Sequence, residues 1–131
     1  MPYFEWKNVY SVGNTKIDQQ HQKLFDIANR FYSAFEEEKS HDELERIFSE
    51  LLDYTRFHFH DEEELMRKHQ YPDLEKHREK HQQLLGLVTR LQEEFDARKI
   101  GVEVEIVRFL KTWLSGHILG IDTRYRAYVN G

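Results

Sequence analysis

The sequence predicts an all-α protein, an up-down-up-down antiparallel four-helix bundle with an extended N-terminal arm. Three observations lead to this prediction. Proline is scarce, with two residues in a chain of 131, so long uninterrupted helices are possible. Apolar residues recur every three or four positions in four successive stretches, which is the pattern of helices with one buried face. The connections between the stretches are short, and short connections place consecutive helices antiparallel.

The expected helices cover, approximately, residues 17–38, 41–68, 73–97 and 102–119. Residues 1–16 precede them and hold aromatic side chains and a Gly13-Asn14 turn, which fits an arm packed along the bundle. The first helix ends in a polar run. Ser40, with Glu43 three residues later, forms the sequence pattern of a capping box and marks the start of the second helix.

Proline and glycine delimit the remaining helices. The second helix should end before Tyr71, because the residue ahead of Pro72 disfavours helical backbone. Asp73 is a suitable N-cap for the third helix, and Gly101 separates the third helix from the fourth. No linker or repeat divides the chain, so we expect a single domain, residues 1–131, that ends in a short segment after the fourth helix.

Composition excludes several classes of function. The 24 Asp and Glu exceed the 19 Lys and Arg, giving a net charge of −5, which is unfavourable for binding nucleic acid or anionic lipid. Cysteine is absent, so a transition metal would have to bind nitrogen and oxygen atoms. No apolar run approaches the ~18 residues of a membrane span, and the chain does not start with a signal peptide. We therefore expect a cytoplasmic protein without membrane insertion and, because no exposed apolar stripe is evident, a monomer.

Polar residues interrupt the apolar stripe of every helix. Buried without a partner, each imidazole or carboxylate would cost several kcal/mol, so something must satisfy them. Their positions along the helices all fall at one end of an antiparallel bundle. They are His21, His58, Glu62, His77, His81 and His117.

Each of these residues also has an ordinary structural interpretation. A single inward histidine is more often a hydrogen-bonded core residue than a metal ligand, and two histidines four residues apart also occur on solvated helices. The convergence of all six at one level favours a metal site, because residues four apart share a helix face. The other three histidines, His41, His60 and His69, fall at helix boundaries or face water, and we assign them no role.

Four segments of the chain resemble the hemerythrin signature in order and spacing, and the similarity covers essentially the whole chain. In length and motif order the chain resembles a single-domain bacteriohemerythrin. The segments are Ile17-Asp18-Gln19-Gln20-His21, His58-Phe59-His60-Asp61-Glu62-Glu63, His77-Arg78-Glu79-Lys80-His81 and Trp113-Leu114-Ser115-Gly116-His117-Ile118-Leu119-Gly120-Ile121-Asp122.

The resemblance implies two iron ions with an oxo or hydroxo bridge, and it adds Asp122 as a ligand. One iron would be bound by His77, His81 and His117, and the other by His21 and His58. Glu62 and Asp122 would bridge both. The second iron then has one ligand fewer, and the resemblance implies that O2 binds reversibly at this vacancy, for transport, storage or delivery to an oxygen-consuming enzyme.

Apolar residues near the ligands are expected to line the O2 pocket, although ordinary core packing explains them equally well. They are Leu24, Phe59, Trp113, Ile118 and Leu119.

Three alternative functions stay open. Di-iron oxidases share the four-helix bundle but use Glu-x-x-His motifs on two helices, and the one match here, Glu38 to His41, lies in a connection. The others are an O2 or redox sensor, which is usually joined to a signalling module, and zinc or another metal at the same ligands. We expect a binding protein rather than an enzyme.

Overall fold

The chain forms four helices, and in the computed structural model residues 5–120 and 124 are described, except for the side chains of residues 115 and 118–120. A short 3₁₀ turn in the arm precedes the helices. The elements are η1 (Asn8–Tyr10), α1 (Thr15–Glu36), α2 (His41–Lys68), α3 (Leu74–Asp96) and α4 (Val102–Gly120). Each helix end lies within two residues of the end expected from the sequence.

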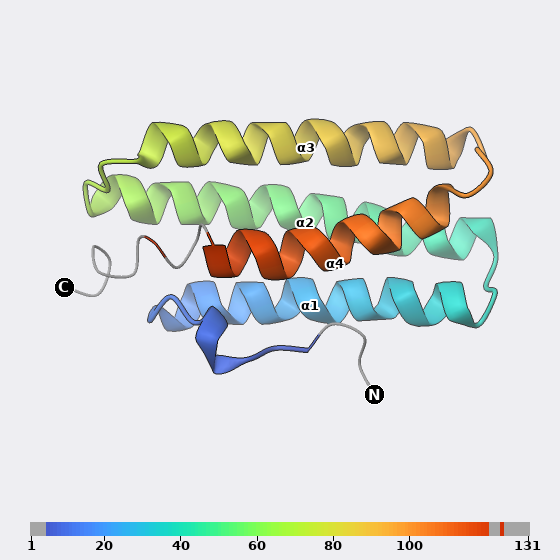
Figure 1. Cartoon of the computed structure of the whole chain (residues 1–131), viewed down its shortest axis with the longest axis horizontal. Coiled ribbons are helices and arrows are strands. Elements are labelled where there is room, and N and C mark those ends of the chain that lie inside the picture. Colours follow the sequence, from blue (N-terminus) through green and yellow to red (C-terminus); the bar gives the residue numbers. More distant parts are fainter. Residues whose placement is uncertain (1–4, 121–123, 125–131) are drawn as a thin grey trace.

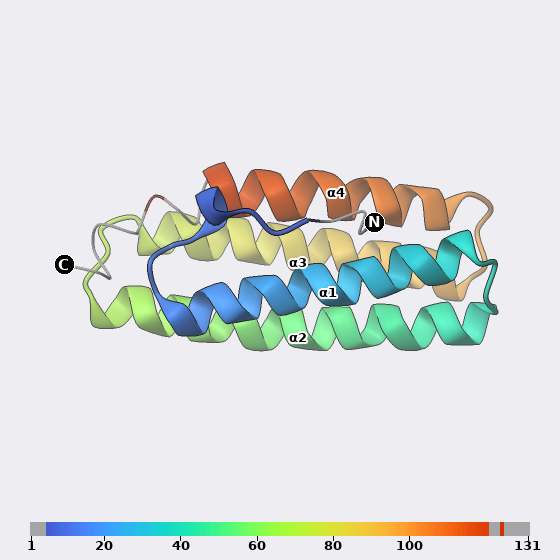
Figure 2. The ribbon, with the colours of Figure 1, turned by 90° about the horizontal axis from the view of Figure 1, so that it is seen from below.

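The four helices run alternately in opposite directions (Figure 1). The main contacts join α1 to α2, α2 to α3, α3 to α4 and α4 back to α1, so each helix has two neighbours and the bundle has one central core. Figure 2 shows the same arrangement from a second side, with η1 lying against the end of α4. The predicted four-helix bundle is therefore confirmed. No described helix is long and apolar enough to cross a membrane.

Local interactions set where the helices begin. The Asn14 side chain accepts a hydrogen bond from the backbone N–H of Ile17, and Ser40 does the same for Glu43, so both residues cap helix N-termini. A cap of this kind contributes about 1 kcal/mol. Asp73 occupies the N-cap position of α3, but its side chain makes no capping hydrogen bond.

The arm is fixed to α1 by hydrogen bonds and aromatic packing. Asp18 accepts hydrogen bonds from the Ser11 hydroxyl at 2.6 Å and the Val12 backbone N–H at 2.9 Å. The Tyr10 ring packs edge-on against Phe25, with 5.5 Å between the ring centroids. Lys7 and Ser11, on either side of η1, have extended backbone. Trp6 and Tyr10 pack against Phe25 of α1.

Two apolar clusters of unequal size fill the core. The larger contains Phe31, Phe48 and Phe95, three fully buried rings at the end where α1 meets α2 and α3 meets α4. The smaller cluster, at the opposite end, contains Val12, Ile17, Met66 and Tyr71. Along α1 and α3, His21, His77 and His81 lie between residues of the two clusters, and along α2 Glu62 does so. The histidines and Glu62 are therefore shielded from water by apolar packing.

Candidate metal centre

Six inward polar residues form one layer near an end of the bundle, and we call them the polar layer. Each has at most 7% of its surface exposed, and Glu62 and His21 have none. The residues come from early turns of α1 and α3 and late turns of α2 and α4, which the antiparallel arrangement brings to one level. The members are His21, His58, Glu62, His77, His81 and His117.

The carboxylate of Glu62 lies at the centre of this layer, and its two oxygens face different histidines. Oε1 is 3.1 Å from Nε2 of His77 and 3.0 Å from Nε2 of His81. Oε2 is 3.3 Å from Nε2 of His21 and 3.5 Å from Nε2 of His58. The carboxylate thus separates two pairs of histidines, one from α3 and one from α1 and α2.

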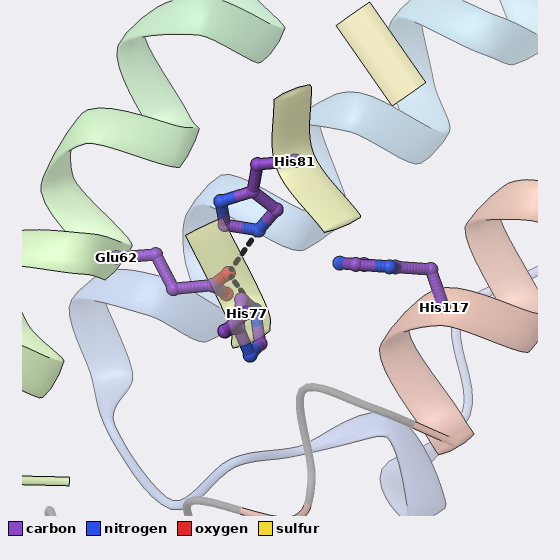
Figure 3. Close-up of side chains that lie close together, drawn as sticks. All are labelled: Glu62, His77, His81 and His117. Carbon is purple, nitrogen blue, oxygen red and sulfur yellow. Dashed lines mark hydrogen bonds and ion pairs between the residues drawn. The ribbon is translucent and has the colours of Figure 1, made fainter. Parts of the chain in front are cut away.

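The fifth histidine belongs to the α3 side. Figure 3 shows His117 pointing from α4 toward His77, His81 and Glu62. The His117 ring centroid is 5.5 Å from that of His77 and 5.4 Å from that of His81. Potential ligand atoms of Glu62 and these three histidines lie within 4.8 Å of one another, and the same holds for His21, His58 and Glu62. Glu62 is common to both groups.

Two hydrogen bonds outside the layer orient its rings. Nδ1 of His81 lies 2.7 Å from a carboxylate oxygen of Glu63, and because a carboxylate only accepts, the ring donates. Nδ1 of His58 lies 2.7 Å from Oε1 of Gln20. The amide nitrogen of Gln20 donates to Asp61, which fixes its oxygen toward the histidine. In a neutral ring the Nε2 atom of each histidine then carries a lone pair directed into the layer.

The electrostatics of the layer favour a positive charge beside Glu62. Burial alone would raise the pKa of the Glu62 carboxyl, but the charge of His58 and hydrogen bonds with His21, His58 and His77 hold this pKa well below its usual range. Burial would lower the pKa of His81, but the nearby carboxylates of Glu62 and Glu63 raise it. The carboxylate therefore remains ionised within an apolar shell.

The arrangement fits a bound metal. Nε2 of His81 is fully buried and makes no hydrogen bond with any described residue, although it lies 3.0 Å from Oε1 of Glu62. Two lone-pair atoms at this distance repel each other unless a proton or a metal ion lies between them. Imidazole nitrogens and carboxylate oxygens, with no thiolate in the chain, suit iron and other transition metals.

Comparison with known proteins agrees with this geometry. The family model of the Hemerythrin HHE cation binding domain matches residues 12–129. The chain belongs to the hemerythrin family. A bacteriohemerythrin of Clostridium acetobutylicum is 33% identical over 130 residues, which cover 93% of this chain and 98% of the relative. A bacteriohemerythrin of Methylococcus capsulatus is 32% identical over 82% of each chain.

Solved structures of hemerythrin share the whole fold. A crystal structure of a hemerythrin mutant matches with a TM-score of 0.91 at 27% identity and covers 100% of both chains. The wild-type hemerythrin structure matches with a TM-score of 0.90 at 28% identity, covering 98% of this chain and 99% of that one. The resemblance seen in the sequence is thus confirmed along the full length of the bundle.

Not every expected site residue can be placed. Asp122 and the side chains of Ile118 and Leu119 lie outside the described residues. Phe59 stacks on the His81 ring, with centroids 3.7 Å apart and planes 2° from parallel. Trp113 lies edge-on to Phe59 at 6.1 Å, and Leu24 is buried one turn after His21. These apolar residues border the polar layer.

The histidines outside the layer differ in environment. His60 and His69 are exposed, as expected. His41 is partly buried at the far end of the bundle.

Sequence reasoning missed Gln20 and Glu63. Gln20 occupies an inward position three residues after Ile17 and is 5% exposed, so a polar residue in the apolar stripe was a usable signal. Glu63 directly follows Glu62 and is only partly buried, so it could not be distinguished from an ordinary surface acid. Such outer partners hold metal-binding histidines in position.

Proposed function

We propose that this hemerythrin-family chain binds O2 reversibly at a non-haem di-iron centre and serves oxygen transport, storage or delivery. One observation carries the proposal. The two oxygens of Glu62 face separate sets of histidines, which is the arrangement of a carboxylate that bridges two ions. A single ion would need only one of these sets.

The proposed ligands follow from this division. His77, His81 and His117 would hold one iron beside Oε1 of Glu62, and His21 and His58 the other beside Oε2. Asp122 is proposed as a second bridging carboxylate, on the strength of the family resemblance, together with an oxo or hydroxo bridge. The iron held by His21 and His58 would then have one protein ligand fewer, and O2 would bind on that side.

The iron pair, when bound, supplies the two electrons that make the binding of O2 favourable and reversible. The protein contributes by ligand choice and by excluding water. Five neutral imidazoles and two carboxylates place little negative charge on the metals, which favours holding O2 over splitting it. We therefore propose a binding protein rather than an enzyme.

The apolar residues beside the polar layer are proposed to line the O2 pocket. The Phe59 ring packs against the rings of His81 and His117, and the Trp113 ring packs against His117. Leu24, Ile118 and Leu119 complete the proposed lining. An apolar wall would admit O2 and hinder water and anions, which slows the loss of electrons from the iron pair.

The cellular role belongs to the same proposal. We place the protein in the cytoplasm as a monomer that carries or stores O2 or passes it to an oxygen-consuming enzyme. Its net charge of −5 favours neither nucleic acid nor anionic membranes as partners.

Oxygen cycling of the purified protein tests the proposal. The reduced protein is analysed for iron, and its visible spectrum is recorded without air, after air, and after air is removed again. We expect about two iron ions per chain and an absorption band that appears with O2 and disappears on its removal. Irreversible oxidation with turnover of a reductant would instead identify an oxidase, and a spectrum insensitive to O2 would exclude O2 binding.

A further inference from the structure

A second group of potential metal ligands lies at the opposite end of the bundle. It consists of His41, the first residue of α2, Glu45 one turn later, and Asp96, the last residue of α3. One ligand atom from each residue lies within 4.8 Å of the others. Measured along α2, His41 is about 25 Å from His58. The group is therefore separate from the polar layer.

The imidazole of His41 is held in a fixed orientation. It stacks on Phe95, with ring centroids 4.2 Å apart and planes 16° from parallel, and the Phe95 ring is fully buried. Only 15% of the His41 side chain is exposed, and its Nε2 atom lies 3.9 Å from Oε2 of Glu45. Stacking holds the face of the ring against Phe95, while Nε2 on the ring edge faces the Glu45 carboxylate.

The two carboxylates of this group have no lysine or arginine partner. Among the described residues, no Lys or Arg forms an ion pair with Glu45 or Asp96, and only the His41 ring lies within ion-pair distance of Glu45. Elsewhere on the surface, acids such as Glu50 and Glu64 are paired with arginines. The negative charge of these two carboxylates is therefore not neutralised by a lysine or an arginine.

We propose that His41, Glu45 and Asp96 form a second metal site that binds a divalent transition metal of the Zn²⁺ class. One nitrogen and two oxygen ligands with open positions for water suit this class, whereas Mg²⁺ and Ca²⁺ prefer sites made of oxygen alone. The negative end of α3 favours the cation and the positive end of α2 opposes it, so the carboxylates supply the net attraction.

Metal binding requires a small movement of the Glu45 and Asp96 side chains but none of the His41 ring. Zinc ligands lie about 2.0–2.2 Å from the metal, so the three ligand atoms must approach one another by roughly 1 Å. Glu45 and Asp96 have flexible side chains that reach solvent, while the stacked imidazole stays in place. A bound ion would connect the start of α2 to the end of α3. This site does not depend on the function proposed for the polar layer.

Titration of the iron-loaded protein with Zn²⁺ tests the site. Binding is followed by calorimetry, and the imidazole resonances of the individual histidines are followed by NMR. We expect one Zn²⁺ per chain, with the largest resonance shift at His41 and no release of iron. His41→Gln, Glu45→Gln and Asp96→Asn should each weaken binding by about tenfold or more.

The matched control is His69→Gln, which removes an exposed histidine at the other end of α2 and should leave the affinity unchanged. Asp96→Asn is the decisive variant because this exposed side chain can change without disturbing the stack on Phe95. The proposal is overturned if no binding occurs below about 1 mM Zn²⁺, if the three variants bind as the parent does, or if Zn²⁺ uptake is matched by loss of iron.

Discussion

The two ends of the bundle use the same four helices in opposite ways. At one end the inward positions carry the histidines and Glu62 of the polar layer, at most 7% exposed. At the other end they carry Phe31, Phe48 and Phe95, and the ring centroid of Phe48 lies 5.9 Å from that of Phe31 and 6.4 Å from that of Phe95. Excluding water stabilises the second end more, because the first has only the smaller apolar cluster beyond its polar layer.

This difference separates stability from function along the bundle axis. Burying phenylalanines stabilises the fold whether or not a metal is bound, by about 1.5–3 kcal/mol for each ring. Burying Glu62 and five histidines costs free energy that their hydrogen bonds and the proposed metal ions would offset. We infer that the aromatic end holds the helices in register so that the polar end can keep its ligands in place. Changes at the two ends should therefore have different consequences.

The largest expected effect is on metal content at the polar end. Glu62→Ala removes the carboxylate that faces both sets of histidines, and we expect iron to fall from about two ions per chain to essentially none. Metal analysis after purification measures this. The control is His60→Ala, on the same helix but exposed, which should retain both ions. Equal losses in the two variants would show that the helix face is wrongly assigned.

The next effect is on stability at the aromatic end. Phe48 is 1% exposed and contacts the rings of Phe31 and Phe95. Phe48→Ala should lower the free energy of unfolding by about 3–5 kcal/mol, because it removes apolar contacts and leaves a cavity. Denaturant unfolding measures the loss. The iron content of the folded fraction should stay unchanged, and a fall comparable to that of Glu62→Ala would contradict the division between the ends.

A smaller effect is expected from the outer partner of His58. Gln20 accepts the hydrogen bond from Nδ1 of that ring at 2.7 Å, and Gln20→Ala leaves the ring free to turn. Iron affinity at the α1–α2 side should fall by about 10–100-fold. A competition titration with a chelator measures this, with Gln19→Ala at the neighbouring exposed position as the control. If both variants bound iron as the parent does, Gln20 would have no positioning role.

The smallest effect concerns an ion pair that spans α1 and α2 on the surface. Both oxygens of Glu50 accept hydrogen bonds from Arg30, at 3.0 and 2.9 Å. The hydrogen bond with Arg30 lowers the pKa of the Glu50 carboxyl and outweighs the opposing effect of burial. Both side chains are about half exposed, so Glu50→Gln should cost less than about 1 kcal/mol.

The stabilisation by the Arg30–Glu50 ion pair depends on pH because folding lowers the pKa of the Glu50 carboxyl. Because the pKa is lower in the folded state, the stabilisation is present above the carboxyl's unfolded pKa and is lost as the pH falls through the folded one. Unfolding free energies of the parent and the Glu50→Gln variant should therefore differ at neutral pH and converge in acid. A difference that grows in acid would contradict the assignment.

Most of the fold could be predicted from the sequence because its signals are local. The apolar spacing predicted each helix. The capping box at Ser40 marked the start of the second helix, and Pro72 marked its end. The six residues of the polar layer were also predictable, since each one interrupts an apolar stripe. Their convergence followed from the alternating directions of the helices.

The remaining features depend on distances that spacing does not determine. The division of the Glu62 oxygens between two sets of histidines needs three-dimensional coordinates. Asp122 entered only through the family resemblance, because five residues after His117 a regular helix would turn it away from the site. His41 seemed an ordinary helix-boundary residue, and its contact with Phe95, more than fifty residues away in the chain, could not be foreseen.

The central claim is that Glu62 bridges two ions, and anomalous diffraction tests it most directly. A crystal of the iron-loaded protein is measured at the iron absorption edge. The account predicts two anomalous peaks on opposite sides of the Glu62 carboxylate, one beside His77, His81 and His117 and the other beside His21 and His58. A single peak, or two peaks on the same side of Glu62, would contradict it.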